Sequence, residues 1–316
     1  MKTAFIATVY NEESTIINFL ESLFHQTKTP DEIIIVDGGS TDNTLTILNE
    51  YITQVKSKVR TKILLFSFPC NRAKGRNYAI QKSHAEIIAC SDAGCMPDSE
   101  WFAEIIKPLA KSTVSVVSGY YKPVTKNYFQ KALAAYTCIP EDRVSQESFL
   151  PSSRSIAFKK TAWGKVGGYP EYLTTCEDLV FASTLRKRGF PFSLQKHAVV
   201  YWPQKKNIYD AFRLFFSYAR GDGKAHYFRR YTPLLFIRYI IGFILLFLVI
   251  ASHRTILTIG TEMLLLLYMV WAIQKNYRYV DSIHAYYLLP LLQLTADIAV
   301  LSGTTLGIIE SIYESR

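Results

Sequence analysis

The sequence predicts an α/β domain with a mostly parallel sheet, followed by a membrane domain of about three transmembrane helices. Two patterns support this fold class. Apolar, β-rich runs alternate with helical patterns over the first 120 residues, and three long apolar runs fill residues 233–309. The chain has 316 residues and is 49% hydrophobic, which allows a packed core and excludes a disordered chain.

Five runs are predicted strands, at residues 3–10, 32–37, 62–68, 86–90 and 113–121. Helices are predicted between them, and Asn11 and Ser14 are candidate caps of the first. A Gly-Gly-Ser-Thr-Asp turn at residues 38–42 leads into the second helix, and further helices are predicted at 72–83 and 97–110. Strands that alternate with helices in this way form parallel sheets with right-handed crossovers.

Polar residues follow three of these strands: Tyr10-Asn11-Glu12, Asp37-Gly38-Gly39-Ser40 and Asp92-Ala93-Gly94. Ligands of open parallel sheets bind at the carboxyl ends of the strands. Asp37 and Asp92 are therefore candidates to hold a base, a ribose or a metal. Each alone is also explained by turn or cap chemistry, which aspartate favours.

Two common nucleotide sites are disfavoured. A dinucleotide-binding fold needs a glycine-rich turn after the first strand, and residues 11–14 contain no glycine. A P-loop is also absent, because Gly223-Lys224 is followed by alanine.

Residues 51–85 carry eight Lys or Arg and no acid, and Arg72, Lys74 and Arg76 are a candidate diphosphate cradle or a solvated helix face. The basic balance of +10 comes without a nucleic-acid stacking motif, so no nucleic acid is expected as a partner.

The apolar runs cover residues 233–251, 255–273 and 285–309, and each contains one charged residue: Arg238, Glu262 or Asp297. Each run is long enough to cross a hydrocarbon core of about 30 Å as a helix. The alternative is three buried helices of a soluble bundle, but soluble helices keep a polar face. Basic residues before the first run and in the second connector place the preceding domain in the cytoplasm, although Arg254 in the first connector argues against this orientation.

Residues 204–231 join the two parts. Apolar residues recur there at helical spacing, and the basic residues lie mostly on the other face. The segment is either a helix in the interface of an anionic leaflet or one packed on the soluble domain. The expected domains are thus 1–203, an amphipathic linker at 204–231, and a membrane domain at 232–316. Five cysteines without paired spacing indicate a reduced, cytosolic setting.

Several motifs in order resemble glycosyltransferase family 2 over about residues 1–225. They are Thr8-Val9-Tyr10-Asn11-Glu12, Val36-Asp37-Gly38-Gly39-Ser40-Thr41-Asp42, Lys74-Gly75-Arg76-Asn77, Ser91-Asp92-Ala93-Gly94-Cys95, Gly167-Gly168-Tyr169-Pro170 and Glu177-Asp178. The resemblance implies a GT-A fold, a nucleotide-sugar donor (a UDP-sugar by family frequency) and inverting transfer. The Q-x-x-R-W motif of processive synthases is missing, which favours transfer of a single sugar.

The resemblance also implies roles for individual residues. Asp37 would bind the nucleobase beside Thr8, Tyr10, Asn11 and Glu12, and Arg76 would reach the base or the diphosphate. Asp92, next to Ala93, would hold the ribose and the metal-diphosphate group. Asp178 would be the general base and Glu177 would help place the acceptor. The implied metal is Mg²⁺ or Mn²⁺, with Asp92 as its ligand, although Gly94 replaces the second acid of the D-x-D motif.

The acceptor side is expected within residues 122–176, where Arg154 could bind an anionic acceptor. Trp163 and Tyr169 could stack on a sugar, although aromatic residues are more often core. Arg220 could contact the acceptor or diphosphate, or face lipid phosphates. The membrane spans suggest a lipid-linked acceptor and contact with membrane lipids.

Two rival functions stay open. One is a non-catalytic membrane scaffold that keeps the fold, motivated by Gly94. The other is a nucleotidyltransferase acting on a lipid phosphate, which would need a phosphate-cradling glycine-rich loop after the first strand.

Overall fold

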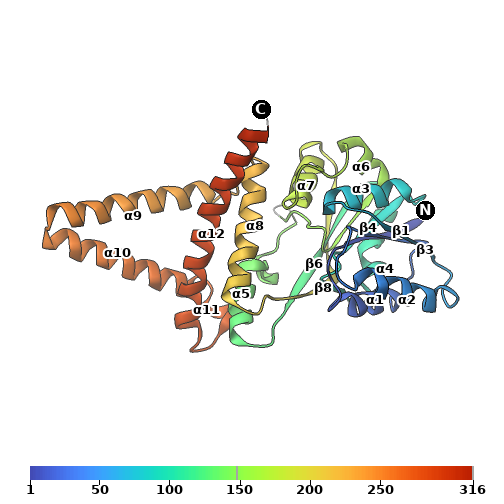
Figure 1. The fold of residues 1–316 in the computed structure, drawn as a ribbon, viewed down its shortest axis with the longest axis horizontal. Helices are drawn as coiled ribbons and strands as arrows, with labels where there is room; N and C mark the ends of the chain where they lie inside the picture. The colour runs from blue at the N-terminus through green and yellow to red at the C-terminus, as the bar shows by residue number, and fades with distance from the viewer. Residues whose placement is uncertain (147–148, 315–316) are drawn as a thin grey trace. The chain divides into compact units, whose positions relative to one another are not determined.

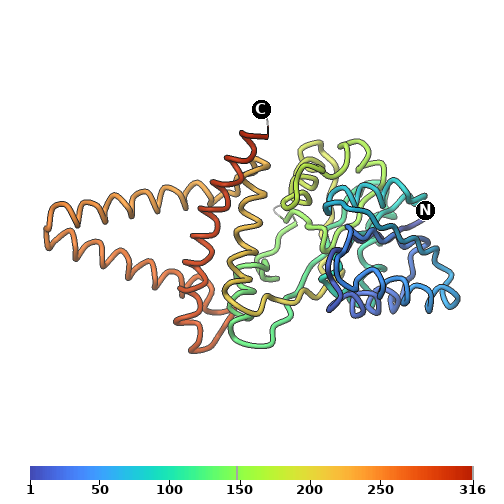
Figure 2. Tube along the Cα trace, viewed as in Figure 1, coloured from blue at the N-terminus to red at the C-terminus, as the bar shows by residue number. Residues whose placement is uncertain are grey.

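The computed structural model describes residues 1–146 and 149–314 of the chain. The chain divides into two compact units. The sheet unit comprises Met1–Val124 and Pro140–Pro203, and the helical unit comprises Thr125–Ile139 and Gln204–Arg316. Figure 2 shows that the chain enters the helical unit twice, first for a short segment and then for its whole C-terminal part.

Helices pack against the sheet of the sheet unit (Figure 1). The sheet has eight strands in the order β3-β2-β1-β4-β7-β6-β8-β5. The strands are β1 (Thr3–Val9), β2 (Glu32–Asp37), β3 (Lys62–Ser67), β4 (Ile87–Cys90), β5 (Met96–Pro97), β6 (Val116–Val124), β7 (Ile156–Lys159) and β8 (Phe192–Pro203). β1, β2, β3 and β4 pair in parallel, as do β6 and β8, which confirms the mostly parallel sheet. β7 is antiparallel to both β4 and β6, so the predicted fifth strand does not lie beside the fourth.

The helices of this unit are α1 (Ile16–Phe24), α2 (Thr44–Lys56), α3 (Arg72–Lys82), α4 (Trp101–Ile106), α6 (Lys160–Val166) and α7 (Glu177–Lys187). Short 3-10 helices cover Lys107–Ala110 and Glu141–Arg143. The helix predicted at 97–110 is therefore three elements: the end of β5, α4 and a 3-10 turn. The predicted caps of the first helix are wrong, because α1 begins at Ile16 after Thr15 and has no side-chain cap.

The core of the sheet unit lies on both faces of its central strands. Every residue of β2 is buried, as the run of isoleucines predicts for a strand covered on both faces. On one face Phe5 packs edge-on against Trp101, whose indole donates to Ser155 Oγ at 2.8 Å. The central strands are thus fixed by packing on both faces, and this packing fixes the positions from which the loops at their carboxyl ends start.

The helical unit contains α5 (Tyr128–Thr137), α8 (Ile208–Lys224), α9 (Thr232–Ser252), α10 (Thr255–Gln274), α11 (Tyr277–Val280) and α12 (Ala285–Glu314). Three candidate spans, Thr232–Ser252, Thr255–Val280 and Ala285–Glu314, are long and apolar enough to cross a membrane. α9 has no buried residue although it is almost wholly apolar, so it has no protein partner for most of its surface. These helices indicate membrane association.

Within the helical unit, α8 packs along α12 (Figure 1). Small residues permit the close approach: a Cβ at Gly303 would lie 2.5 Å from the Phe216 carbonyl oxygen, and one at Gly307 would collide with that of Arg220. Ala211 and Phe215 of α8 join the same apolar cluster as Leu288 and Leu292. The apolar face of residues 204–231 is therefore used against α12, a contact that neither interpretation of this segment included.

The charged residues of the apolar helices do not behave alike. Arg238 of α9 pairs with Asp297 of α12, with 2.5 Å between Nη2 and Oδ2. The hydroxyls of Tyr239 and Tyr268 donate to the same oxygen, and Gln293 donates to Oδ1 at 2.9 Å. A buried carboxylate with four donors joins α9, α10 and α12 in a single polar network. Glu262, by contrast, is exposed on α10.

Candidate active site

The loops after β1 and β2 are bonded to each other at the carboxyl edge of the sheet. Asn11 adopts a left-handed conformation with φ of 54°. Its amide nitrogen donates to Ser40 Oγ at 3.0 Å, and its side-chain oxygen accepts from the Thr41 nitrogen at 2.8 Å. The expected binding segment is therefore a pre-formed turn, in which Tyr10 is 57% exposed and available for a ligand.

Asp37 ends β2 and is completely buried. Its carboxylate accepts from Ser40 Oγ at 2.5 Å, from Ser67 Oγ at 2.7 Å and from the Gly39 nitrogen at 3.2 Å. Gly39 has a φ of +84°, which favours glycine. In this structure Asp37 shapes the turn, and its contact with a nucleobase stays a prediction.

The centre of the edge is a buried arginine between two carboxylates. Arg76 of α3 donates from Nη2 to Asp92 Oδ1 and from Nη1 to Glu177 Oε1, both at 2.7 Å. The side chains of Arg76 and Glu177 are 2% and 4% exposed, whereas that of Asp92 is 29% exposed. Side chains from α3, from the loop after β4 and from the start of α7 thus meet on one guanidinium, and among these three only Asp92 opens toward solvent.

Charges within this triad set its ionisation. Burial opposes the charge on Arg76, but Asp92 and Glu177 outweigh it and hold the pKa of the guanidinium well above its ordinary value. Burial would raise the pKa of Asp92, yet Arg76, with Arg154 and Arg72, lowers it. For Glu177 burial dominates and raises the pKa, against the opposing effect of Arg76. Of the two carboxylates in the triad, Asp92 is therefore the one that is kept ionised more firmly.

Arg76 packs against Tyr169, which Asn77 of the same helix holds in place. The guanidinium lies over the Tyr169 ring at 5.4 Å, and that ring stacks on Phe181 at 4.1 Å. The Asn77 amide donates to the Tyr169 carbonyl at 2.8 Å and accepts from its nitrogen and from Trp163 Nε1. Tyr169 is 2% exposed, so the alternative that it stacks on a sugar is wrong and it belongs to the core.

Asp178 lies beside Glu177 but faces a different environment. Both residues are in the first turn of α7, where the helix dipole favours acids. Asp178 Oδ2 accepts from the Ser153 nitrogen at 3.1 Å, and Oδ1 accepts from the Leu179 nitrogen at 2.8 Å. Its side chain is half-buried, whereas that of Glu177 is enclosed. Two backbone donors thus orient the Asp178 carboxylate.

The two arginines expected on the acceptor side have different partners. Arg154 lies 4.0 Å from the centre of the Trp202 ring and 5.7 Å from that of Tyr121, and its charge lowers the pKa of Asp92. It therefore belongs to the same edge as the triad. Arg220 forms a bidentate pair with Glu310 inside the helical unit, at 2.8 and 2.6 Å. Its guanidinium is engaged by α12 in this structure, and its contact with an acceptor or a diphosphate stays a prediction.

The family model for glycosyl transferase family 2 matches residues 4–162, about half of the chain. The chain belongs to glycosyltransferase family 2. Rhamnosyltransferase RfbN of Salmonella typhimurium is 22% identical over 213 residues, which is 63% of this chain and 66% of that protein. TarS of Staphylococcus aureus, a poly(ribitol-phosphate) β-N-acetylglucosaminyltransferase, is 34% identical over 210 residues, 65% of this chain and 36% of TarS. The chain spans between about a third and two thirds of the length of such relatives.

Solved structures support the fold. The mannosyltransferase PcManGT of Pyrobaculum calidifontis, in complex with GDP-Man and Mn²⁺, superposes with a TM-score of 0.68 at 17% identity, covering 100% of this chain and 88% of that one. Residues 1–349 of S. aureus TarS with UDP give 0.52 at 18% identity, covering 100% and 92%. These likenesses confirm the GT-A fold expected of a family 2 member.

The residues at the edge are compatible with a divalent metal. No group of three His, Cys, Asp or Glu that could hold a metal occurs within residues 1–146 and 149–314. Asp92 uses Oδ1 for Arg76, and its Oδ2 makes no hydrogen bond with the described residues. Magnesium and manganese accept one or two carboxylates when substrate phosphates and water complete the shell. Asp92 fits that requirement.

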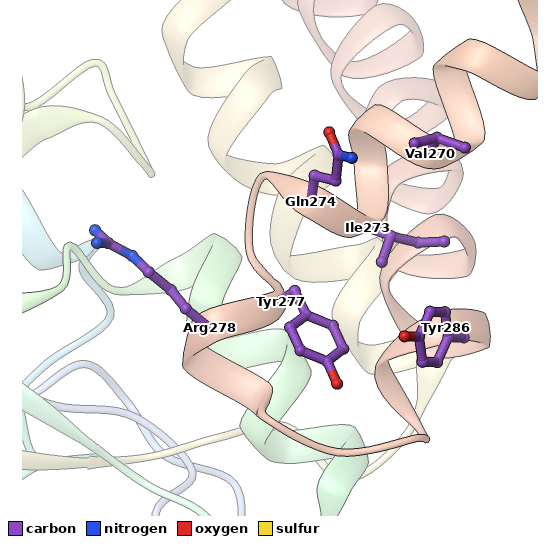
Figure 3. A pocket seen from close by; sticks show the side chains of 6 residues that line it. All are labelled: Val270, Ile273, Gln274, Tyr277, Arg278 and Tyr286. Carbon is purple, nitrogen blue, oxygen red and sulfur yellow. The ribbon is translucent and has the colours of Figure 1, made fainter.

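The helical unit has a separate, open surface pocket of about 590 Å³ where α10, α11 and α12 meet (Figure 3). Val270 and Ile273 line it together with the rings of Tyr277 and Tyr286, whose centres are 5.6 Å apart. Gln274 and Arg278 complete the lining, and the Arg278 side chain points away from the two rings in Figure 3. Apolar and aromatic walls of this kind suit a hydrocarbon chain.

Proposed function

We propose that the sheet unit transfers a single sugar, with inversion, from a nucleotide-sugar to a lipid-linked acceptor at the cytosolic face of a membrane. The observation that carries the proposal is the triad, because Arg76 ties Asp92 on the donor side to Glu177, the neighbour of the candidate base. Family 2 membership supports nucleotide-sugar chemistry, and TarS and RfbN are named for transfer to cell-envelope polymers.

Asp178 is the proposed general base. The acceptor hydroxyl oxygen forms a bond to the anomeric carbon, the bond from that carbon to the diphosphate oxygen breaks, and the hydroxyl proton passes to Asp178. A carboxylate is a sufficient base because the proton becomes acidic as the new bond forms. The Ser153 and Leu179 nitrogens hold the carboxylate in one orientation.

Glu177 takes a different role from the one expected of it. Because it is buried and bonded to Arg76, it does not reach an acceptor directly. We assign it a positioning role, in which it fixes Arg76 and thereby Asp92. Arg76 in turn supplies positive charge beside the carboxylate that would face the diphosphate.

The donor is proposed to lie along the strand ends, against Thr8, Tyr10, Asn11, Glu12, Asp37 and Ala93. Asp92 would hold Mg²⁺ or Mn²⁺, and such an ion, when bound, offsets the negative charge of the leaving diphosphate. UDP-sugars are the first donors to test, because TarS has been solved with UDP and with UDP-GlcNAc.

The lipid-linked acceptor is proposed from the helical unit. Three apolar helices indicate membrane association, and the pocket beside Tyr277 and Tyr286 offers apolar walls. Arg154 is the proposed contact for an anionic acceptor group, and membrane lipids would surround α9 and α10. The basic residues that precede α9 support a cytoplasmic sheet unit, with residues 232–316 as the membrane domain.

The test is nucleotide release by detergent-purified full-length protein given UDP-, GDP- or dTDP-sugars with Mn²⁺. Release of one nucleotide that rises when polyprenyl-diphosphate-linked sugars, which carry acceptor hydroxyls, are added would support the proposal. Binding of a nucleotide with no release and no transfer to any lipid acceptor would instead favour the rival function, a non-catalytic membrane scaffold. The absence of binding to every donor would contradict the proposed sugar transfer and would also favour the scaffold.

A further inference from the structure

We infer that Glu12 supplies the second carboxylate of the metal site, in place of the acid that is missing at Gly94. The inference rests on the proposed function, since it concerns the ion that would accompany a nucleotide diphosphate. It concerns a residue that the sequence placed only beside the nucleotide.

Glu12 is the neighbour of Gly94 on the side where a Cβ atom would lie. A Cβ added at Gly94 would have Glu12 Oε1 at 3.8 Å as its one neighbour within 4 Å among the described residues. The oxygens of an aspartate lie about 2.4 Å from its own Cβ, from ordinary bond lengths. The Glu12 oxygen therefore lies within reach of the region that a carboxylate at position 94 would occupy.

Glu12 is held in this place by its own surroundings. Its nitrogen donates to Thr44 Oγ1 at 2.8 Å, and its carbonyl accepts from the nitrogens of Thr15 and Ile16. Its Oε2 accepts from Thr15 Oγ1 at 2.5 Å. The backbone nitrogen and carbonyl of Glu12 and one of its carboxylate oxygens are thus fixed, and the remaining carboxylate oxygen is the one beside Gly94. A ligand arranged in advance loses little conformational freedom on binding.

The chemistry of the pair suits a hard divalent cation. Asp92 stands two residues before Gly94, and its carbonyl accepts from the Cys95 nitrogen at 3.0 Å in a tight turn. Mg²⁺ and Mn²⁺ prefer carboxylate oxygens, and Mg²⁺ commonly uses one or two of them with substrate phosphates. Asp92 and Glu12 together would restore the two-carboxylate composition of a D-x-D motif from two different strand ends.

Glu13 provides a matched control. It is the same residue type, next in sequence and exposed, and its Oε2 accepts from the Asn43 nitrogen at 3.0 Å. Loss of its charge changes the net charge of the loop as much as loss of the Glu12 charge does. Any effect confined to Glu12 is therefore not a general electrostatic effect.

The test is Mn²⁺ affinity of the detergent-purified full-length protein, followed by electron paramagnetic resonance with saturating UDP or GDP. Glu12→Gln is expected to weaken Mn²⁺ binding by about 10-fold or more, and Glu13→Gln to leave it unchanged. Adding Gly94→Asp to Glu12→Gln is expected to restore most of the affinity. Gly94 does not have a positive φ and its Cβ position is open, so the backbone accepts aspartate.

Two results would overturn the inference. One is equal Mn²⁺ affinity in Glu12→Gln and Glu13→Gln. The other is a loss of Mn²⁺ affinity in Glu12→Gln that Gly94→Asp does not restore and that equals, as a fold-change, the loss of UDP affinity measured in EDTA. That result would make Glu12 a contact of the nucleotide rather than of the metal. If the wild-type protein binds no nucleotide, the proposed function fails separately, and Mn²⁺ titration without nucleotide still compares the two glutamine variants.

Discussion

Replacement of Arg76 by methionine tests whether the buried triad organises the sheet unit. The substitution keeps a long, flexible side chain but removes both charge-assisted hydrogen bonds, to Asp92 and to Glu177. It leaves Glu177, whose side chain is 4% exposed, without its cation. Asp92 is more open and can recover part of its hydration.

Removal of one partner from a buried ion pair destabilises proteins by about 3–5 kcal/mol, because the other charge stays buried and unpaired. Since Asp92 is partly hydrated, we expect the lower end, about 3 kcal/mol. With an urea dependence of about 2 kcal/mol/M, the unfolding midpoint would fall by about 1.5 M. Arg72→Met, an exposed change in the same helix, should alter stability by less than about 0.5 kcal/mol.

The destabilisation should depend on pH in a defined direction. Without Arg76, burial raises the pKa of Glu177 further above its value in the unfolded chain, and the pKa of Asp92 rises because its largest lowering influence is gone. The folded variant then binds more protons than the unfolded chain, so its stability rises as the pH falls through the window between the two values. In the wild-type protein Asp92 has a lowered pKa, so the stability that its carboxylate contributes is lost as the pH falls. The difference in free energy of unfolding between the wild-type protein and Arg76→Met should therefore narrow from pH 7 toward about pH 4.

The assay is urea unfolding of the full-length protein in detergent, followed by pulse proteolysis of the sheet unit at several pH values. A midpoint for Arg76→Met within about 0.3 M of that of Arg72→Met at pH 7 would refute the reasoning. A gap that is independent of pH would show that the two carboxylates do not carry the cost.

Two further predictions concern the helical unit. Gly307→Leu should lower the thermal stability in detergent by the equivalent of about 1–3 kcal/mol or more, because the new side chain meets the α8 backbone. Gly242→Leu, at an open position of α9, is the control. Equal losses of stability in the two variants would contradict the close packing of α8 on α12. Asp297→Leu should destabilise strongly by leaving Arg238 unpaired, and Arg238→Leu in the same protein should recover most of the loss. Glu262→Gln on the exposed face of α10 should change little, and no recovery in the double variant would argue against the pair.

The local sequence was sufficient for the first half of the sheet. Isoleucine-rich runs such as β2 and the polar residues behind them follow from periodicity, and parallel pairing then brings Asp37 and Asp92 to one edge. The insertion of β7 between β4 and β6 could not be derived in this way. Its register depends on tertiary pairing across more than 60 residues rather than on its short apolar run.

The triad was also beyond local reasoning. Arg76 and Glu177 are 101 residues apart, and both were expected to face the substrate. In the structure the two side chains are buried and form an ion pair with each other. Asn77 lay within a recognised motif without an assigned role, although a buried amide beside a key arginine needs partners. One missed signal was present in the sequence: Gly303 and Gly307, four residues apart in an apolar helix, form the small-residue face on which α8 packs.

The most direct test of the central claim is a paired measurement on Asp178→Asn with the donor that the wild-type protein uses. The account predicts that the rate of sugar transfer falls by about 10²–10⁴-fold while the dissociation constant of the nucleotide stays within about twofold, because Asp178 is bonded to backbone donors rather than to the triad. Transfer at the wild-type rate would contradict Asp178 as the base. An equal loss of nucleotide affinity would show instead that Asp178 belongs to the donor site.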